Sequence, residues 1–245
     1  MICGVFLEQV RLPDNVIFDV TLNEAKEIQE HLRSRITLKD SVDVGDVRLI
    51  GGVDCAFLDS GIDADRPVEA LAAAVTVDIL TGEVRETVFA RAPVHLPYIP
   101  GYLSFREGPA VIAALRELKR LPGVMIYDGC GIAHSRGCGL ASHMGVLTGI
   151  PSIGCAKSKL CGTCDEPDRE KGSWTDLVLR GEKVGYCVRS RTDVRPVFVS
   201  PGSGISIESS RRLVLAAAKK YRLNEPTRHA HNAVTQYKRD LMESL

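Results

Sequence analysis

Apolar and polar residues are arranged along the chain in a pattern that predicts an α/β protein. Near the start, TLNEAKEIQEHLRSRI (residues 21–36) has apolar residues at helical spacing behind a Thr-x-x-Glu capping box. Three apolar runs follow this stretch, and a Thr-Gly turn joins the last two. We therefore expect an N-terminal amphipathic helix and then three consecutive antiparallel strands, in VRLIGGVDCAF, ALAAAVTVDIL and EVRETVFARAPV.

The centre of the chain has the order helix, strand, helix, strand. An apolar stripe from Phe105 predicts a helix that Pro122 and Gly123 end. VMIYD then predicts a short buried strand, LASHMGVLTG a short helix ending at Gly149, and PSIGCAK another strand. A helix between two neighbouring strands requires a parallel crossover, so we expect one mixed sheet flanked by helices.

The last third of the chain predicts a hairpin region, DLVLRGEKVGYCV and RPVFVS, followed by two helices. We find no internal repeat, low-complexity tract or clean linker. With 245 residues, of which 44% are hydrophobic, the chain can fill one large core. We therefore expect a single domain over residues 1–245, with its N-terminal helix at about 21–36.

The net charge of the chain excludes few classes of binding partner. Lys plus Arg and Asp plus Glu both number 31, so net charge gives no global argument for nucleic acid or membrane binding. Any polyanion site must be a local patch. No apolar run is long enough for a membrane span, and the first residues lack the order of a signal peptide. We expect a cytoplasmic protein with no membrane association and no obligate protein partner.

Eight cysteines are expected to be mostly reduced thiols in that compartment. Cys161 and Cys164 form the one pair at metal-ligand spacing, in LCGTC. A structural zinc site usually needs two such pairs, so loop thiols are the favoured interpretation over zinc.

Two aspartates end or interrupt apolar strands, which is costly unless they are paired or bind a cation. Asp54 lies in IGGVDCAF and Asp128 in VMIYDG, and Glu107 near the start of a helix can add a third carboxylate. Oxygen ligands of this kind suit Mg²⁺. The alternatives are that the aspartates cap turns and that the glutamate suits the helix dipole.

Phosphodiester hydrolysis is the reaction that such a cluster would serve best, because metal ions can activate water and neutralise phosphate oxygens. A Ser-His-Asp hydrolase is a poor rival, since the chain has no G-x-S-x-G turn. GCGIAH and PGSG do not form a complete nucleotide-binding motif either.

The stretch VHLPYIPGYLSFREGP predicts a rigid tip, because two prolines flank Tyr98 and Ile99 and a glycine follows. Both side chains can pack inward, which is the structural interpretation. Alternatively, they form an apolar wedge of the kind that proteins insert between bases.

Taken together, these motifs resemble the endonuclease V family in the same order along the chain. The resemblance covers most of residues 47–232, which we take as the catalytic core. It implies a ribonuclease H-like fold and a Mg²⁺-dependent nuclease, with Mn²⁺ able to substitute, that acts on inosine in nucleic acid. Members cut the second phosphodiester bond on the 3′ side of the lesion. The motifs are IGGVDCAF, LPYIPGYLSFREGP, YDGCGIAHSRGCGLASHMGVLTGIPSIGCAKSKL, GSW, RPVFVSPGSGIS and EPTRHAH.

The resemblance also implies roles for individual residues. Asp54 and Asp128 match the metal-binding aspartates, and Glu107 matches a further acidic member of the site. Lys157, in GCAK, matches a lysine near the scissile phosphate. His231 matches the active-site histidine, which in the family follows the alanine of this motif, whereas His229 precedes it.

For recognition, the resemblance implies a wedge and a base pocket. Tyr98, Ile99 and Pro100 fall in the wedge motif that separates the strands beside the lesion. His134 follows the glycine turn where the family builds its inosine pocket. Gly129 and Gly131 permit the close approach of backbone that a flipped base needs.

The chain departs from the family pattern at PGSG, where Gly-His is frequent, and at LCGTC. The resemblance assigns neither segment a function. Three activities remain open: repair cleavage of DNA beside deoxyinosine, cleavage of inosine-containing RNA, and non-catalytic binding of nucleic acid. Single-stranded DNA is a further partner for the first of these. All carboxylate positions, Lys157 and His231 are present, which disfavours the non-catalytic alternative.

Overall fold

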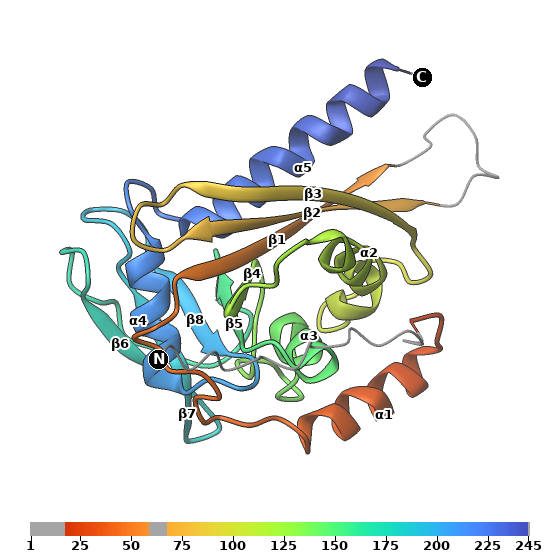
Figure 1. Ribbon diagram of the computed structural model, residues 1–245. Helices are drawn as coiled ribbons and strands as arrows, with labels where there is room; N and C mark the ends of the chain where they lie inside the picture. The colour runs from red at the N-terminus through yellow and green to blue at the C-terminus, as the bar shows by residue number, and fades with distance from the viewer. Residues whose placement is uncertain (1–17, 59–67, 245) are drawn as a thin grey trace, which may run out of the picture.

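Within residues 18–58 and 68–244, which the computed structural model describes, eight strands form one sheet. The strands are β1 (Leu49–Leu58), β2 (Glu69–Asp78), β3 (Val84–Pro93), β4 (Val124–Tyr127), β5 (Ser152–Ala156), β6 (Trp174–Leu179), β7 (Glu182–Val188) and β8 (Val197–Pro201). Their order is β3-β2-β1-β4-β5-β8-β7-β6, as Figure 1 shows.

The sheet is mixed, which confirms the expected topology. Strands β1, β2 and β3 pair antiparallel, and β4 pairs parallel with both β1 and β5. Strands β5, β8, β7 and β6 then pair antiparallel. The parallel pairing places the carboxyl end of β4 beside the middle of β1.

Helices cover both faces of the sheet (Figure 1). One face carries α2 (Leu103–Glu117) and α3 (Leu140–Thr148), with α1 (Leu22–Arg33) packed on α3. The other face carries α4 (Ile207–Ala217) and α5 (Glu225–Glu243), and α5 crosses β1 and β2.

Successive side chains along a strand point to opposite faces of the sheet, so the central strands contribute to a hydrophobic core on each face. Val53 and Tyr127 are buried on the face of α2 and α3. Ile50 and Ile126 are buried on the other face. The central strands are therefore covered on both sides, as their near-continuous apolar sequences indicate.

Helix ends follow the expected signals at the start of α1 and the end of α3 and differ elsewhere. Helix α1 ends at Arg33 instead of residue 36, and α2 ends at Glu117, before Pro122 and Gly123, because the backbone of Leu118 is already extended. The capping box of α1 at Thr21 and Glu24 is formed, and Gly149 ends α3 with φ of 70°, a conformation that favours glycine. Helix α2 begins at Leu103, two residues before the expected start, because the N–H of Phe105 already donates to the carbonyl of Tyr102 at 3.0 Å.

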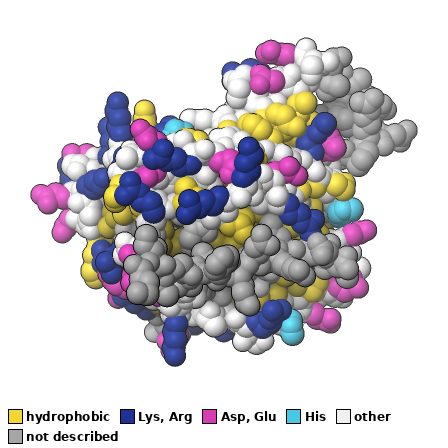
Figure 2. All heavy atoms as spheres, in the orientation of Figure 1, with side chains coloured by type: hydrophobic (Ala, Val, Ile, Leu, Met, Phe, Trp, Pro, Cys, Tyr) yellow, Lys and Arg dark blue, Asp and Glu magenta, His cyan; other side chains and the backbone are white. Residues whose placement is uncertain are grey.

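On the face shown in Figure 2, Lys and Arg side chains lie among Asp and Glu side chains, as a zero net charge predicts. In residues 18–58 and 68–244, no helix is both long and apolar enough to cross a membrane.

Candidate active site

Two carboxylates meet where β1 and β4 lie side by side. The parallel register pairs Val53 with Tyr127, so Asp54 and Asp128 are the next residues on the two strands. Their side chains are 17% and 20% exposed. The strand pairing therefore brings together two acids that are 74 residues apart in the sequence (128 − 54).

Helix α5 reaches this point because the first turn of the helix packs on Gly52, a glycine of β1. A Cβ atom on Gly52 would lie 2.3 Å from the carbonyl carbon of Pro226, so only glycine permits this approach. Two residues further along β1, the Oδ2 of Asp54 lies 2.7 Å from the Nδ1 of His231. His229, in contrast, faces Glu225, with 3.3 Å between Nε2 and Oε2.

Lys157 follows β5 and places its Nζ atom 2.5 Å from the Oδ2 of Asp128. The lysine is itself held by Arg222, whose Nη2 donates to the carbonyls of Lys157 at 2.6 Å and Pro196 at 2.9 Å. We did not identify Arg222 from the sequence, because an arginine in YRLNE carries no motif. Only the fold shows that it fixes the segment after β5.

Glu107 approaches the same point from α2. Burial of its carboxyl group and the negative charges of Asp54 and Asp128 raise the pKa of Glu107 to about 8. Burial also raises the pKa of Asp54, against the opposing hydrogen bond of His231. For Lys157, burial is outweighed by the hydrogen bond and charge of Asp128, so the pKa is raised. We call Asp54, Glu107, Asp128, Lys157 and His231 the acidic corner.

The acidic corner suits a hard divalent cation. Its acceptors are carboxylate oxygens, and the negative charges of Asp54 and Asp128 add to the burial that raises the pKa of Glu107. A cation would relieve this repulsion. Lys157 contacts Asp128, and His231 contacts Asp54. Among residues 18–58 and 68–244, no three His, Cys, Asp or Glu side chains are already grouped closely enough to hold a metal ion.

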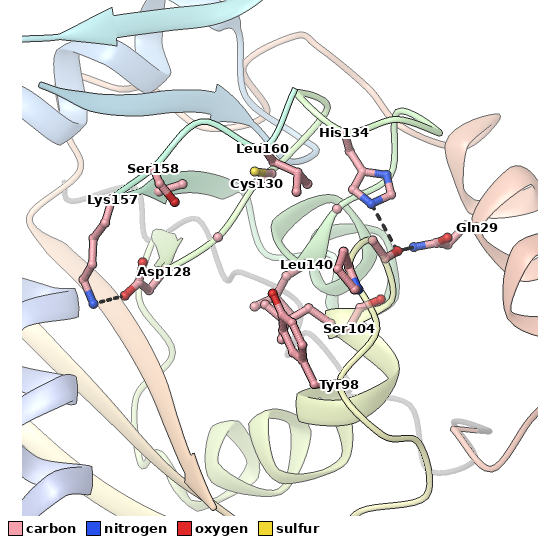
Figure 3. Close-up of a pocket in the computed structure, with 16 residues that line it drawn as sticks. Gln29, Tyr98, Ser104, Asp128, Cys130, His134, Leu140, Lys157, Ser158 and Leu160 are labelled. Carbon is pink, nitrogen blue, oxygen red and sulfur yellow. Dashed lines mark hydrogen bonds and ion pairs between the residues drawn. The ribbon is translucent and has the colours of Figure 1, made fainter. Parts of the chain in front are cut away.

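A cavity of about 260 Å³ opens directly beside the acidic corner. In Figure 3, Asp128 and Lys157 lie at one end, His134 and Gln29 at the other, and Tyr98 along one side. We call this cavity the side pocket. Its remaining lining residues are Pro100, Gly101, Leu103, Ser104, Gly129, Cys130, Gly139, Leu140, Ala156, Ser158 and Leu160.

The three residues of the expected wedge are oriented differently. The side chain of Tyr98 is 67% exposed, and Pro100 is also exposed. Both line the side pocket. Ile99 is partly buried against the hydrophobic core under α2. The tip therefore presents an aromatic ring outward and uses its aliphatic residue as an anchor.

The two glycines expected in the pocket also differ. Gly129 lines the side pocket, and a Cβ atom there would meet Leu140 at an ordinary 3.6 Å. Gly131 does not line it. A Cβ atom on Gly131 would lie 1.9 Å from the carbonyl oxygen of Pro201, so this glycine allows the loop to pack on β8.

His134 is buried at the end of the side pocket. Burial and the charge of Arg136 lower the pKa of His134 to about 4, against the hydrogen bond to Gly101. The imidazole is therefore neutral at physiological pH. This end of the pocket therefore carries an uncharged imidazole.

The two segments without an assigned role lie outside the acidic corner. Thr163, between Cys161 and Cys164, pairs with Val178 of β6. In PGSG, the N–H groups of Gly202 and Ser203 donate to the carbonyl and Oγ of Ser152, at 2.6 and 2.9 Å. The hydrogen bonds of PGSG give this segment a structural role.

Comparison with known proteins identifies the family. Residues 30–232 match the family model described as Endonuclease V. The chain belongs to the endonuclease V family. Endonuclease V of Roseiflexus sp. (strain RS-1) is 47% identical over 210 residues, which cover 86% of this chain and 90% of that protein. As a member of this family, the chain is an endonuclease.

Solved structures of endonuclease V share the fold. The Streptomyces avermitilis protein has a TM-score of 0.84 at 37% identity, covering 95% of this chain and 99% of that one. A Ciona intestinalis endonuclease V, solved with a 24mer DNA containing an inosine followed by a ribo-adenosine, has a TM-score of 0.76 at 26% identity over 89% of this chain and 98% of that one. The expected ribonuclease H-like α/β fold is thereby confirmed.

Proposed function

We propose that this endonuclease V is Mg²⁺-dependent, recognises deoxyinosine in DNA and hydrolyses the second phosphodiester bond 3′ to it, initiating repair. The products would be a 3′-hydroxyl and a 5′-phosphate. The observation that carries the proposal is the juxtaposition of Asp54 and Asp128, in adjacent register, with a pocket of base-like size. Cleavage chemistry and base selection would thus occur side by side.

Asp54, Asp128 and Glu107 would hold the metal, since they supply the carboxylate oxygens that Mg²⁺ and Mn²⁺ prefer. When bound, the metal activates water and neutralises charge on the phosphate. Lys157 contributes a point charge at the scissile phosphate, because it follows β5 and reaches Asp128. His231, whose Nδ1 is oriented by Asp54, can hold or transfer a proton through its other ring nitrogen.

In the side pocket, the extruded base would lie against Gly129 and Leu140, close to backbone groups that can bond to its edge. Tyr98 would fill the gap left in the duplex, because its ring is exposed at the mouth of the pocket. At the end of the pocket away from Asp128 and Lys157, the polar groups of a purine edge would then meet uncharged residues, so selection would rest on hydrogen bonds and shape.

Matched oligonucleotides test the proposal: one DNA and one RNA, each with a single inosine, and the same pair with adenine. We expect Mg²⁺-dependent cleavage of the inosine DNA at the second bond 3′ to the lesion, and no cleavage of the adenine controls. Resistance of both inosine strands with Mg²⁺ present would contradict the proposal.

RNA is the second candidate substrate. The Ciona intestinalis complex contains a ribo-adenosine after the inosine, so a family member accommodates a 2′-hydroxyl at that position. Faster cleavage of the inosine RNA than of the inosine DNA would make this candidate the correct one.

A further inference from the structure

One backbone carbonyl beside the side pocket accepts hydrogen bonds from three side chains. The oxygen of Gly101 lies 2.9 Å from the Nε2 of Gln29, 2.7 Å from the Nη2 of Arg136 and 3.1 Å from the Nε2 of His134. A carbonyl oxygen has two lone pairs, so three donors saturate it. In Figure 3, the dashed lines from His134 and Gln29 meet at one oxygen atom. We call the three side chains the carbonyl clamp.

The clamped residue is the one that follows the Tyr98–Pro100 tip. Gly101 has φ of 87°, in the region that favours glycine. A Cβ atom there would also lie 3.0 Å from the Nη2 of Arg136 and 3.3 Å from the Nε2 of His134. The conformation therefore favours a glycine where the tip is fastened, and a Cβ atom there would crowd two members of the clamp.

Gln29 enters the clamp from α1, outside all the motifs that resemble the family. It is 1% exposed and shares the buried face of this helix with Ala25 and Leu32, where an apolar residue would be ordinary. Besides Gly101, its amide donates to the carbonyl of Cys138 at 3.1 Å and accepts from the Nε of Arg136 at 2.6 Å. Both ends of the buried amide are thus occupied.

His134 is committed to the clamp through both ring nitrogens. Because the Gly101 carbonyl can only accept, Nε2 must carry the proton, and Nδ1 is then free to accept from the N–H of Arg136 at 3.2 Å. Neither nitrogen is left for the edge of a base. The hydrogen bonds of His134 to the tip and to the loop explain why this histidine lies at the pocket.

Arg136 completes the connection to the wedge. Its guanidinium lies 4.2 Å from the ring centre of Tyr102, the residue that precedes α2. The clamp therefore joins three parts that are distant in sequence: α1, the pocket loop around residues 129–139, and the tip. A shift of any one would change the separation between tip and pocket.

We propose that Gln29 is a positioning residue that sets the wedge tip against the base pocket, by ordering the carbonyl of Gly101 together with Arg136 and His134. This inference rests on the proposed function. Strand separation by the tip is needed only when the inosine lies in a duplex. Loss of the clamp should therefore impair duplex substrates more than single-stranded ones.

The test compares Gln29→Met, which keeps side-chain length and removes the amide, with the wild-type enzyme. Removal of the three hydrogen bonds of this amide should lower kcat/KM about tenfold on an inosine duplex and less than about threefold on the same inosine strand alone. A 2-aminopurine beside the inosine gives a second readout without cleavage, and its fluorescence on binding in Ca²⁺ should rise less than with wild type.

Arg136→Met removes a different donor to the Gly101 carbonyl, one that comes from the pocket loop. This variant replaces Gln29→Met in the test if Gln29→Met does not fold. The effects of the two substitutions should be less than additive, because both remove donors to one oxygen. Gln236→Met, on the exposed side of α5, is the matched control and should behave as wild type.

Equal losses on duplex and single strand, or no loss on either, would overturn the positioning role. Failure of the wild-type enzyme to cut any inosine strand would instead contradict the proposed function. The wild-type rate and the variant's duplex-to-single-strand ratio therefore separate the two ideas.

Discussion

The acidic corner and the side pocket lie next to each other but differ in the chemistry of their side chains. The acidic corner consists of charged and titratable side chains that perturb one another, as the raised pKa values of Glu107 and Asp54 show. The side pocket shares Asp128 and Lys157 with the acidic corner, but its other lining residues, among them three glycines and the neutral His134, are uncharged. Phosphate hydrolysis requires concentrated charge, whereas selection of an uncharged base requires shape and fixed hydrogen bonds.

This difference predicts how each region is damaged. The acidic corner should fail when a charge is removed, because its function depends on electrostatics. The side pocket should fail when an atom is added, because its function depends on space. Substitutions of each type can test whether the two regions are separable.

Removal of a charge from the acidic corner should give the largest effect. In Asp128→Asn we expect single-turnover cleavage of inosine DNA to fall by about 10³-fold or more, because the proposed metal would lose a charged ligand. Binding, measured by fluorescence anisotropy, should stay within about threefold of wild type, since base contacts remain. Asp168→Asn, an exposed residue outside the acidic corner, is the control. Equal loss of binding and cleavage would show that the two regions are not separable.

Addition of one methyl group should distinguish the two pocket-loop glycines. Gly131→Ala should lower the free energy of unfolding by about 1–3 kcal/mol, because its Cβ would lie 1.9 Å from the Pro201 oxygen. Gly129→Ala should change stability by less than about 0.5 kcal/mol. It should still weaken binding of inosine DNA, because the methyl group points towards Leu140 in the side pocket.

Urea unfolding and anisotropy on both variants check this prediction. Undiminished inosine selection in Gly129→Ala would place the base elsewhere. Full stability of Gly131→Ala would mean that the loop can move away from β8.

The smallest effect concerns pH. Because the pKa of folded His134 is about 4, below its ordinary 6.5, the unfolded chain binds this proton more readily. Its contribution to stability is therefore complete above pH 6.5 and is lost as the pH falls towards 4. His143, whose pKa burial lowers to about 3, adds a similar loss.

In His134→Gln, the dependence of unfolding free energy on pH should decrease by about one proton between these limits. Urea titrations from pH 4 to 7 measure it, and His143→Gln gives the comparison. If the pH dependence of the unfolding free energy is the same in His134→Gln as in the wild type, the His134 imidazole is protonated in the folded protein. That result would contradict the neutral state that its burial indicates.

Sequence patterns predicted most of the fold because the strong signals are local. The Thr21 capping box and the Gly149 helix end act within a few residues, and both are formed. The start of α2 was less predictable, because Tyr102 lacks a side chain that caps a helix. The order of the strands depends on long-range pairing, which periodicity does not encode.

The motifs also led to most of the candidate site, since Asp54 lies within a recognisable strand and Asp128 and Lys157 directly follow two others. They could not supply Gln29 or Arg222. The partners of Gln29 lie 72 and 109 residues away, and those of Arg222 up to 65 residues away. Polar side chains whose partners are distant backbone carbonyls leave no local pattern.

The contact between Asp54 and His231 has a consequence for synthesis of the protein. These residues are 177 positions apart, and the histidine arrives on the last helix of the described structure. During translation, β1 therefore emerges long before His231 does. A nascent chain on the ribosome, surrounded by RNA, would lack a complete nuclease site until α5 had docked over Gly52.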